Sequence, residues 1–257
     1  MQFASLRRTN MNKTAIIIPS RLEAKRLPGK PLKLINKKEM ILHVYDVAKS
    51  SNTGDVYVAT PNQKIIDVVK NYGGNVIKTS EDHQTGTDRI FEVFEETLKS
   101  KANIIINLQG DMPNLNSKAI SDLVNYMKNN KCDIGTLASN LKSDNDIINP
   151  NVVKVAVKEK LYENKFLKAF DFSRSKIDQS YYLYHHVGIY AYTGEALKRY
   201  VGLKRSKLEL ERKLEQLRAL ENNMSIHVGY LNSCPLSVDT EEDLIEIKKL
   251  MEKNEKN

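Results

Sequence analysis

The chain has 257 residues, of which 40% are hydrophobic, and a formal net charge of +8. This length suits one large domain, or one domain with an inserted lobe, and the hydrophobic share can build a substantial core. No run of eighteen apolar residues exists, so we expect no membrane insertion. The positive excess is spread along the chain, which favours small anionic substrates over nucleic acid. Cys132 and Cys234 fit no metal spacing and predict ordinary thiols in a reducing, cytoplasmic compartment.

The first twelve residues differ from the rest of the chain. They contain Arg7 and Arg8 but no acid and no apolar h-region, which is not the pattern of a secretory signal. We expect residues 1–12 to be a disordered or non-native tail, with Met11 as an alternative start.

From residue 14 onwards, strands alternate with helices according to the spacing of the apolar residues. Strands are predicted at residues 14–19, 55–60, 75–78, 104–108 and 134–141. Helices are predicted at residues 40–50, 63–72, 87–100 and 117–129. This alternation indicates βαβ units with right-handed crossovers and a mostly parallel sheet, an α/β fold.

The middle of the chain has a different pattern. Short β runs are predicted at residues 152–157, 169–172 and 187–192, followed by a weak helix at 193–201 and a long one at 208–222. We interpret roughly residues 150–225 as an antiparallel lobe inserted into a single domain of residues 13–257. A strand at 226–230 and a helix at 240–253 close the chain.

The loop after the first strand is rich in positive charge. It carries Arg21, Lys25, Arg26 and Lys30 together with a Pro-Gly turn. In open α/β sheets, ligands bind beyond the carboxyl ends of the strands, so this loop predicts a site for a polyanion such as a triphosphate. The alternative is a solvated run of charge.

The loop DHQTGTDR, residues 82–89, follows the third strand. Gly86 allows close approach of the backbone to a ligand, and hydroxyl and amide groups such as that of Thr85 can read a base. The alternative interpretation is the start of a helix, capped by Thr87 or Asp88.

Two acidic residues, Asp111 and Asp239, stand next to predicted strands or helices. Asp111, in the segment LQGDMP, comes directly after a strand buried on both faces, where a carboxylate needs a partner or a metal. Asp239 precedes a capping box formed by Thr240 and Asp243. Neither acid has an obvious cation partner in the sequence. Together they predict a Mg²⁺ site, because Mg²⁺ binds one or two carboxylates plus substrate phosphates; the alternative for Asp111 is a turn before Pro113.

The segments HHVGIYAY and LEQLR carry further polar residues. His185 and His186 are adjacent on a strand and face opposite sides, so both cannot bind one metal. We expect one of them to hydrogen-bond a hydroxylated or carboxylated ligand. From spacing alone, Glu215, Gln216 and Arg218 fit a solvated helix face.

These motifs together resemble the 3-deoxy-manno-octulosonate cytidylyltransferases, the CMP-Kdo synthetases of lipopolysaccharide synthesis. The resemblance covers about residues 14–253 and rests on eight motifs in the family order: IIIPSR…KRLPGKPL, DHQTGTDR, LQGD-P, NPNVVKV, FSR, HHVGIYAY, KLE…KLEQLRAL and VDTEEDL. It implies a nucleotidyltransferase fold with a dimerisation and substrate lobe, a homodimer, Mg²⁺, CTP and a 2-keto sugar acid as substrates.

The resemblance also implies roles for individual residues. The phosphate contacts are Arg21 and Lys30, and the metal ligands are Asp111 and Asp239, and these four are the expected catalytic residues. The residues near the cytosine or the sugar are Thr85, Gly86 and Gln109. The residues expected to bind the sugar acid, besides Gln109, are Arg174, His186, Tyr190, Glu215, Gln216 and Arg218.

The chain departs from the family pattern in two places. Met112 stands where the family usually has Glu after QGD, and the segment SKIDQS replaces the usual Ile-Pro-aromatic stretch after Arg174. An amino-substituted octulosonate or a nonulosonic acid therefore stays an alternative substrate. A glycosyltransferase is disfavoured because Asp-X-Asp is absent at Asp111, and a non-catalytic nucleotide-binding regulator is disfavoured because Lys30, Asp111 and Asp239 are all present.

Overall fold

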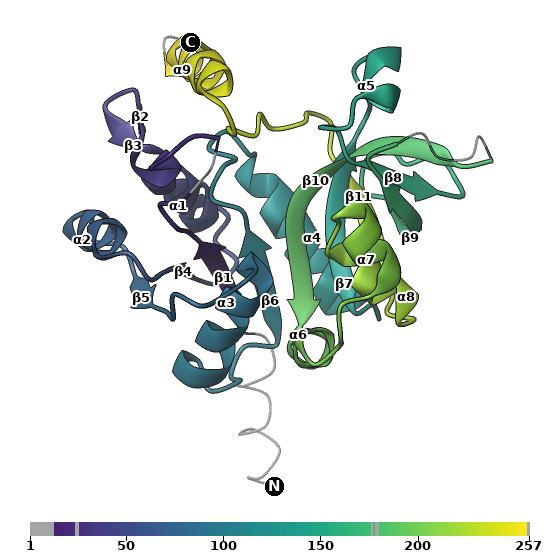
Figure 1. Cartoon of the computed structure of the whole chain (residues 1–257), viewed down its shortest axis with the longest axis horizontal. Coiled ribbons are helices and arrows are strands. Elements are labelled where there is room, and N and C mark those ends of the chain that lie inside the picture. Colours follow the sequence, from purple (N-terminus) through teal and green to yellow (C-terminus); the bar gives the residue numbers. More distant parts are fainter. Residues whose placement is uncertain (1–12, 24–25, 176, 178–179, 256–257) are drawn as a thin grey trace, which may run out of the picture. The chain divides into compact units, whose positions relative to one another are not determined.

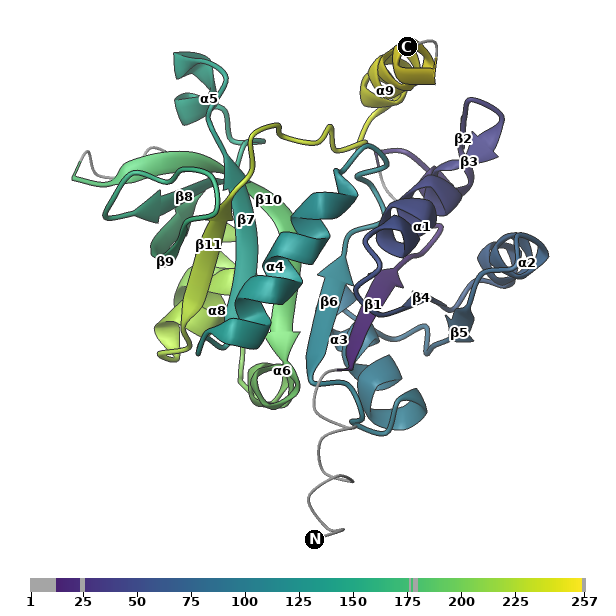
Figure 2. The ribbon, with the colours of Figure 1, turned by 180° about the vertical axis from the view of Figure 1, so that it is seen from behind.

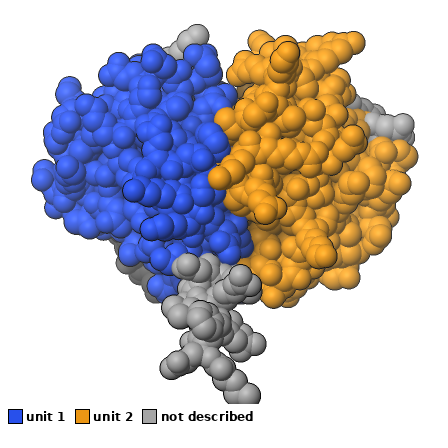
Figure 3. All heavy atoms as spheres, turned by 90° about the horizontal axis from the view of Figure 1, so that it is seen from below, with its two compact units in different colours: residues 1–121, 235–257 blue, residues 122–234 orange. Residues whose placement is uncertain are grey.

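The computed structural model describes residues 13–23, 26–175, 177 and 180–255. They form two compact units: unit 1 comprises residues 1–121 and 235–257, and unit 2 comprises residues 122–234 (Figure 3). The insertion expected from the sequence spans roughly residues 150–225. The predicted tail of residues 1–12 lies outside the described residues, as do parts of the altered segment after Arg174. No helix among the described residues is both long and apolar enough to cross a membrane.

Unit 1 contains four parallel strands in the order β5-β4-β1-β6 (Figure 1). Their bounds are β1 Thr14–Pro19, β4 Asp55–Thr60, β5 Val76–Lys78 and β6 Ile104–Leu108. All five residues of β6 are buried, as expected for a parallel strand covered on both faces. Because the strands are parallel, their carboxyl ends share one edge, and the loops that follow β1, β5 and β6 leave from it.

Helices cover both faces of these four strands. The connections from β1 to β4 and on to β5 run through α1 (Met40–Ser50) and α2 (Gln63–Asn71) in one direction along the sheet. The connection through α3 (Gly86–Glu92) returns past β1 to β6. Right-handed crossovers therefore put α3 on the face opposite α1, as Figures 1 and 2 show.

The remaining elements of unit 1 are short or terminal. A 3₁₀ turn at Lys30–Leu32 and a hairpin of β2 (Leu34–Ile35) and β3 (Lys38–Glu39) precede α1. Helix α9 (Glu241–Glu255) closes the chain, and α4 (Ser117–Asn129) crosses from unit 1 into unit 2.

Unit 2 contains five strands whose pairings form a closed circuit. The order is β10-β7-β11-β9-β8, and β8 pairs again with β10. The strands are β7 Ile134–Ser139, β8 Lys154–Val157, β9 Phe166–Ser173, β10 Tyr182–Thr193 and β11 Ile226–Tyr230. The β7–β11 pair is parallel and the other pairs are antiparallel. The circuit closes because β9 and β10 are long. The first half of β9 pairs with β11 and the second half with β8, whereas the first part of β10 pairs with β8 and the rest with β7.

The helices of unit 2 are α5 (Asp144–Ile148), α6 (Gly194–Val201), α7 (Lys207–Arg212) and α8 (Gln216–Glu221). The prediction of one helix over residues 208–222 was wrong, because Lys213 is left-handed with φ 54° and separates α7 from α8. The break lets Arg218 on α8 reach back to the buried Glu209 on α7.

The predicted helix at residues 87–100 was also too long. Helix α3 continues only as a π turn at Val93–Thr97, where Leu98 N–H donates to the carbonyl of Val93 at 2.9 Å. Lys99 and Ser100 then take positive φ values. Apolar spacing does not distinguish this wider turn from an α-helix.

Candidate active site

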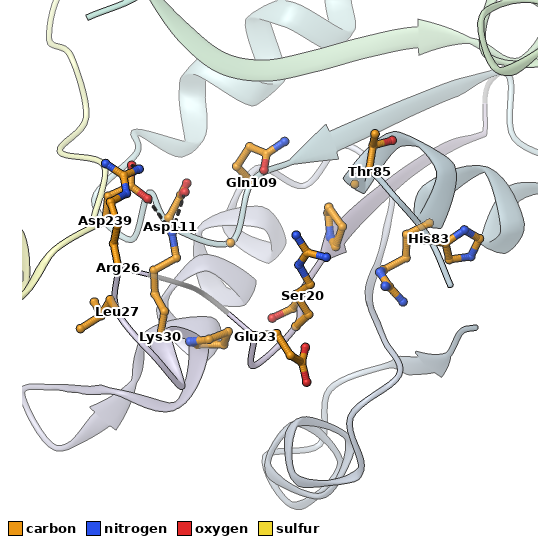
Figure 4. A pocket seen from close by; sticks show the side chains of 16 residues that line it. Ser20, Glu23, Arg26, Leu27, Lys30, His83, Thr85, Gln109, Asp111 and Asp239 are labelled. Carbon is orange, nitrogen blue, oxygen red and sulfur yellow. Dashed lines mark hydrogen bonds and ion pairs between the residues drawn. The ribbon is translucent and has the colours of Figure 1, made fainter. Parts of the chain in front are cut away.

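A pocket of about 410 Å³ lies in unit 1, at the edge where β1 and β6 end (Figure 4). This volume is within the range of small-molecule sites. Its lining residues come from the loops after β1, β5 and β6 and from the segment before α9: Pro19, Ser20, Arg21, Glu23, Arg26, Leu27, Lys30, Pro31, His83, Thr85, Gly86, Arg89, Gln109, Gly110, Asp111 and Asp239.

The loop after β1 brings Lys30 into the pocket by a tight turn. Gly29 has φ 68°, a left-handed conformation that favours glycine, and its N–H donates to the carbonyl of Leu22 at 3.0 Å. Pro31 then lies in the first positions of the 3₁₀ turn, where its missing N–H is not needed. The Pro-Gly-Lys sequence thus fixes the direction from which the Lys30 side chain enters.

An apolar cluster brings Asp239 to the same place. Leu27 and Val238 are both buried in it, and its other members are Ile35, Met40, Leu244 and Ile247. The N–H of Val238 donates to the carbonyl of Asp111 at 2.9 Å. Packing on one side of the loop and a backbone hydrogen bond on the other therefore place the two predicted carboxylates beside each other.

Lys30 lies between these carboxylates. Its Nζ is 3.0 Å from Asp111 Oδ2 and 3.0 Å from Asp239 Oδ1 (Figure 4). The second oxygen of Asp239, Oδ2, is 3.0 Å from the guanidinium of Arg26. The expectation that the two acids have no internal cation partner was wrong, because that partner comes from a distant loop.

Burial and charge act in opposite directions on this cluster. Burial raises the pKa of Asp111; Lys30 opposes that rise and the neighbouring charge of Asp239 adds to it. Burial tends to lower the pKa of Lys30, but the two carboxylates outweigh it and the pKa is raised. Lys30 therefore stays positively charged, and Asp111 is the acid most in need of a nearby cation.

Helix α3 holds the other wall of the pocket. Thr85 caps it: its hydroxyl accepts from the N–H of Asp88 at 3.1 Å, and its own N–H donates to Asp88 Oδ2 at 3.2 Å. The alternative reading in which Thr87 or Asp88 is the cap was therefore wrong. Gly86 at the first turn packs closely against β1, since a Cβ there would lie 3.2 Å from the ring of Pro19.

Two charged residues of α3 fix the loop before it. The guanidinium of Arg89 is buried and donates to Thr79 Oγ1 and, at 2.8 Å, to the carbonyl of Ser80. Both carboxylate oxygens of Glu92 accept from the N–H of Ser80, at 3.2 and 3.0 Å, and Oε2 also contacts Nε2 of His83. Burial and the charge of Arg21 lower the pKa of Arg89.

The candidates for nucleotide binding all line this pocket. Arg21 is exposed at the end of β1, Lys30 is described above, and Thr85, Gly86 and Gln109 are partly buried along the rim. Arg21 and Arg89 are close enough for their charges to interact, so the pocket presents several cationic groups.

Apart from Gln109, which lines the pocket of unit 1, the candidates for sugar binding lie in unit 2. His186 is buried, its Nε2 is 2.9 Å from Thr136 Oγ1, and its ring centroid is 5.4 Å from that of Tyr190. Burial lowers the pKa of His186 to about 3, so this imidazole is neutral at physiological pH. His185, on the other side of β10, instead contacts Cys234.

The other sugar candidates are engaged within unit 2. Arg218 is buried and donates to Glu209 Oε2 through Nε at 2.8 Å and to Oε1 through Nη2 at 2.6 Å. Gln216 is also buried, so the prediction of a solvated helix face was wrong for Gln216 and Arg218. The backbone carbonyl of Glu215 accepts from Tyr200, and Arg174 donates to the carbonyl of Pro150 at 3.0 Å.

Comparison with known proteins assigns the chain to a family. Residues 15–226 match the family model of the cytidylyltransferases. A curated 3-deoxy-manno-octulosonate cytidylyltransferase from Thermodesulfovibrio yellowstonii is 41% identical over 90% of this chain and 95% of its own length. One from Bartonella bacilliformis is 40% identical over 93% of this chain and 98% of its own length. The chain belongs to the 3-deoxy-manno-octulosonate cytidylyltransferase family.

The fold agrees with this family. The structure of CMP:2-keto-3-deoxy-manno-octonic acid synthetase complexed with CTP has a TM-score of 0.86 and 35% identity, and the match covers 95% of this chain and 100% of that one. A 4-diphosphocytidyl-2C-methyl-D-erythritol synthase from Anaerococcus prevotii, at 13% identity and a TM-score of 0.64, shares the fold over 94% of this chain and 99% of its own.

The two carboxylates of this cytidylyltransferase fit a magnesium ion by their chemistry. Both offer hard oxygen donors, and Mg²⁺ takes one or two protein carboxylates and completes its shell with water and substrate phosphates. Burial raises the pKa of Asp111, so a divalent cation beside it would favour the charged form of its carboxylate. Among the described residues no group of three or more His, Cys, Asp or Glu side chains could hold a metal by itself.

Several lining residues had no individual role in the sequence-based interpretation, namely Ser20, Glu23, Arg26, His83 and Arg89. His83 and Arg89 lie in the quoted motif DHQTGTDR, and Arg26 lies in the quoted cationic loop. Their position in those motifs could therefore have identified these three residues as candidates for the pocket. Ser20 directly follows the last residue of β1, which was the available signal for that residue.

Proposed function

We propose that the chain transfers a cytidylyl group from CTP to 3-deoxy-manno-octulosonate. The anomeric hydroxyl oxygen of the sugar acid bonds to the α-phosphorus of CTP, and the bond from that phosphorus to the bridging oxygen breaks. The hydroxyl proton is released, and the products are the CMP-sugar and pyrophosphate. The observation that carries the proposal is the cationic pocket around Lys30 in a chain 41% identical to a curated enzyme of that name.

The chain's own residues act by position and charge. Arg21, Arg26 and Lys30 line the pocket and neutralise the triphosphate and the pyrophosphate that leaves. Arg suits bidentate contact with phosphate oxygens, and Lys acts as a point charge. Negative charge spreads over the phosphoryl oxygens in the transition state, so fixed cations contribute most of the catalysis and no protein nucleophile is required.

Asp111 and Asp239 are the residues that would hold Mg²⁺. When bound there, the ion would supply charge neutralisation of the phosphates and orient the reacting groups. The support is the adjacency of the two carboxylates and the hard-oxygen character of the donor set, as described above.

On the sugar side, we infer that Arg174 binds the carboxylate of the sugar acid, because a guanidinium matches a carboxylate bidentately. His186 and Tyr190, whose rings adjoin, are the proposed partners of its hydroxyl groups. The remaining proposed contacts are Gln109, Glu215, Gln216 and Arg218.

We further infer that the enzyme works as a cytoplasmic homodimer in lipopolysaccharide synthesis. The free thiols of Cys132 and Cys234 support a reducing compartment. The exposed aromatic side chains of Tyr162 and Tyr182 in unit 2 support an interface on that unit. Light scattering on the purified chain measures the mass that decides between monomer and dimer.

The activity is tested by release of pyrophosphate. The purified chain with Mg²⁺ is incubated with CTP and a panel of 3-deoxy-manno-octulosonate, its amino-substituted analogue and a nonulosonic acid. We expect release with 3-deoxy-manno-octulosonate and CTP, and much less with ATP or GTP in place of CTP. Release with only another sugar acid would contradict the assignment of the sugar substrate. Tighter binding of a purine triphosphate in calorimetry would contradict the assignment of CTP.

A further inference from the structure

The hydroxyl of Ser20 is a buried polar group without a partner. Ser20 follows directly after β1, is 6% exposed, and its Oγ has no hydrogen-bond partner among the residues that the structure describes. A buried hydroxyl in this condition costs free energy in the ligand-free protein, because the hydrogen bonds it makes with water are lost on folding.

The location of this hydroxyl distinguishes it from other unpartnered groups. Five buried side-chain atoms lack a partner within the described ranges, namely Thr14 Oγ1, Ser20 Oγ, Asn36 Nδ2, Asn107 Oδ1 and Ser206 Oγ. Of their residues, Ser20 alone is part of the pocket lining (Figure 4). Thr14 lies at the opposite end of the same strand.

The backbone fixes the position of Ser20. Its N–H donates to the carbonyl of Ala59 at 2.9 Å, which extends the β1–β4 pairing by one residue beyond Pro19. The backbone of Ser20 is therefore held at the edge of the sheet beside the pocket, and rotation about its χ1 bond is the motion that would turn the buried hydroxyl towards a ligand. Its neighbours Arg21 and Lys30 are pure hydrogen-bond donors that attract anionic oxygens into the same space.

We propose that Ser20 is a nucleotide-binding residue whose hydroxyl donates a hydrogen bond to an oxygen of the bound nucleoside triphosphate. The group is kept unpartnered in the free protein and finds its partner in the ligand. This inference rests on the proposed function, because it takes CTP as the ligand of the pocket.

The two variants Ser20→Ala and Thr14→Val test it. Each removes one buried, unpartnered hydroxyl from β1 or its direct continuation and leaves the shape nearly unchanged. Calorimetry measures the Kd for CTP with Mg²⁺ and without sugar acid, and a thermal melt without ligand measures the Tm.

For Ser20→Ala we expect the Kd for CTP to rise about tenfold, the ratio that corresponds to one hydrogen bond to a charged group. Its Tm without ligand should be unchanged or higher, since the removed group has no partner there. Thr14→Val should show the same Tm behaviour and an unchanged Kd for CTP.

Two results would overturn the assignment. One is an unchanged Kd in Ser20→Ala, and the other is a weaker Kd accompanied by a clearly lower Tm, which would give the hydroxyl a structural role. The failure of the proposed function is a separate observation, because it would appear as a parent chain that neither binds CTP nor releases pyrophosphate from it.

Discussion

Lys30 Nζ and Asp111 Oδ2 lie 3.0 Å apart, although the two residues are separated by 81 positions in the chain. The same ammonium also contacts Asp239, so one cation is shared by two acids. In the ligand-free protein Lys30, which we propose to bind phosphate, and the two acids that we propose to bind the metal thus neutralise each other. Binding of a triphosphate together with Mg²⁺ would exchange these contacts, with Lys30 turning to phosphate oxygens and the acids to the metal.

Replacement of Asp111 by Asn tests the role of this carboxylate. Asp111→Asn should reduce kcat about 100-fold or more, because several kcal/mol of metal-assisted stabilisation of the transition state are lost. The Tm should change little, since Asp239 still pairs with Lys30 and burial no longer acts against a charge. Asp55→Asn, at an exposed position where β4 begins, is the control and should retain full activity. Near-normal turnover of Asp111→Asn at saturating Mg²⁺ would argue against the metal site.

Replacement of Lys30 by Ala should affect both binding and stability. We expect a KM for CTP raised at least about tenfold, since a charged hydrogen bond contributes roughly 1.5 to 3 kcal/mol. We also expect a lower Tm, because Asp111 and Asp239 lose the cation that they share. Steady-state kinetics and a thermal melt measure the two effects.

The matched control is Lys33→Ala, which removes the same charge from the same loop. Lys33 forms an ion pair with Glu241 at 3.5 Å and its side chain is 39% exposed, so its loss should change either quantity little. Equal effects of the two variants would indicate a general effect of charge. Lys25, a second cation of this loop, lies outside the described residues.

The ion pair between Glu209 and Arg218 predicts a strong effect on stability. Arg218→Met should lower the free energy of unfolding by about 3 kcal/mol, because the buried carboxylate of Glu209 loses its bidentate partner and keeps only the longer contact to the half-exposed Arg205 and the N–H of Ser206. The double variant Glu209→Met/Arg218→Met should lose less than the single one. Urea unfolding measures both; a double variant that is less stable than the single one would contradict this account of the pair.

The buried His186 predicts a dependence of stability on pH. Its pKa is about 3 in the folded protein and about 6.5 when unfolded, so the unfolded chain binds the proton first as the pH falls. The stabilising contribution is complete above pH 6.5 and is lost progressively towards pH 3. Between pH 7 and pH 5, the parent should lose about 2 kcal/mol more than His186→Gln. Identical losses in urea unfolding at the two pH values would show that His186 is not held neutral.

The sequence predicted the four parallel strands of unit 1 and the helices α1 and α2 well, because each has one dominant pattern. Strand β6 is a short apolar run and is buried throughout, and α1 shows helical spacing over its whole length. Where a polar residue is turned inward, the pattern is misleading. Gln216 and Arg218 suggested a solvated face of one long helix, but the ion pair of Arg218 with Glu209 requires a break at Lys213.

The pocket was predictable in part. The motifs identified the loops, because parallel strands bring their carboxyl ends to one edge. They did not predict that Lys30 would contact both acids, since this depends on the packing of Leu27 against Val238, residues separated by most of the chain. They also gave no sign that Ser20 lacks a partner, because satisfaction of a hydroxyl depends on all the atoms around it.

The closed circuit of strand pairings in unit 2 restricts how two copies of the chain can associate. Each of its five strands pairs with two others within the described part of the chain, so none of the five is an edge strand over its whole length. Unit 1 does end in a strand with one neighbour, but β5 has only three residues and terminates in Lys78, a short and charged template. We therefore expect self-association through unit 2 to use side chains rather than addition of a strand. A dimer of that kind can be weakened by substitution at an exposed tyrosine without disturbing the backbone pairing of either copy.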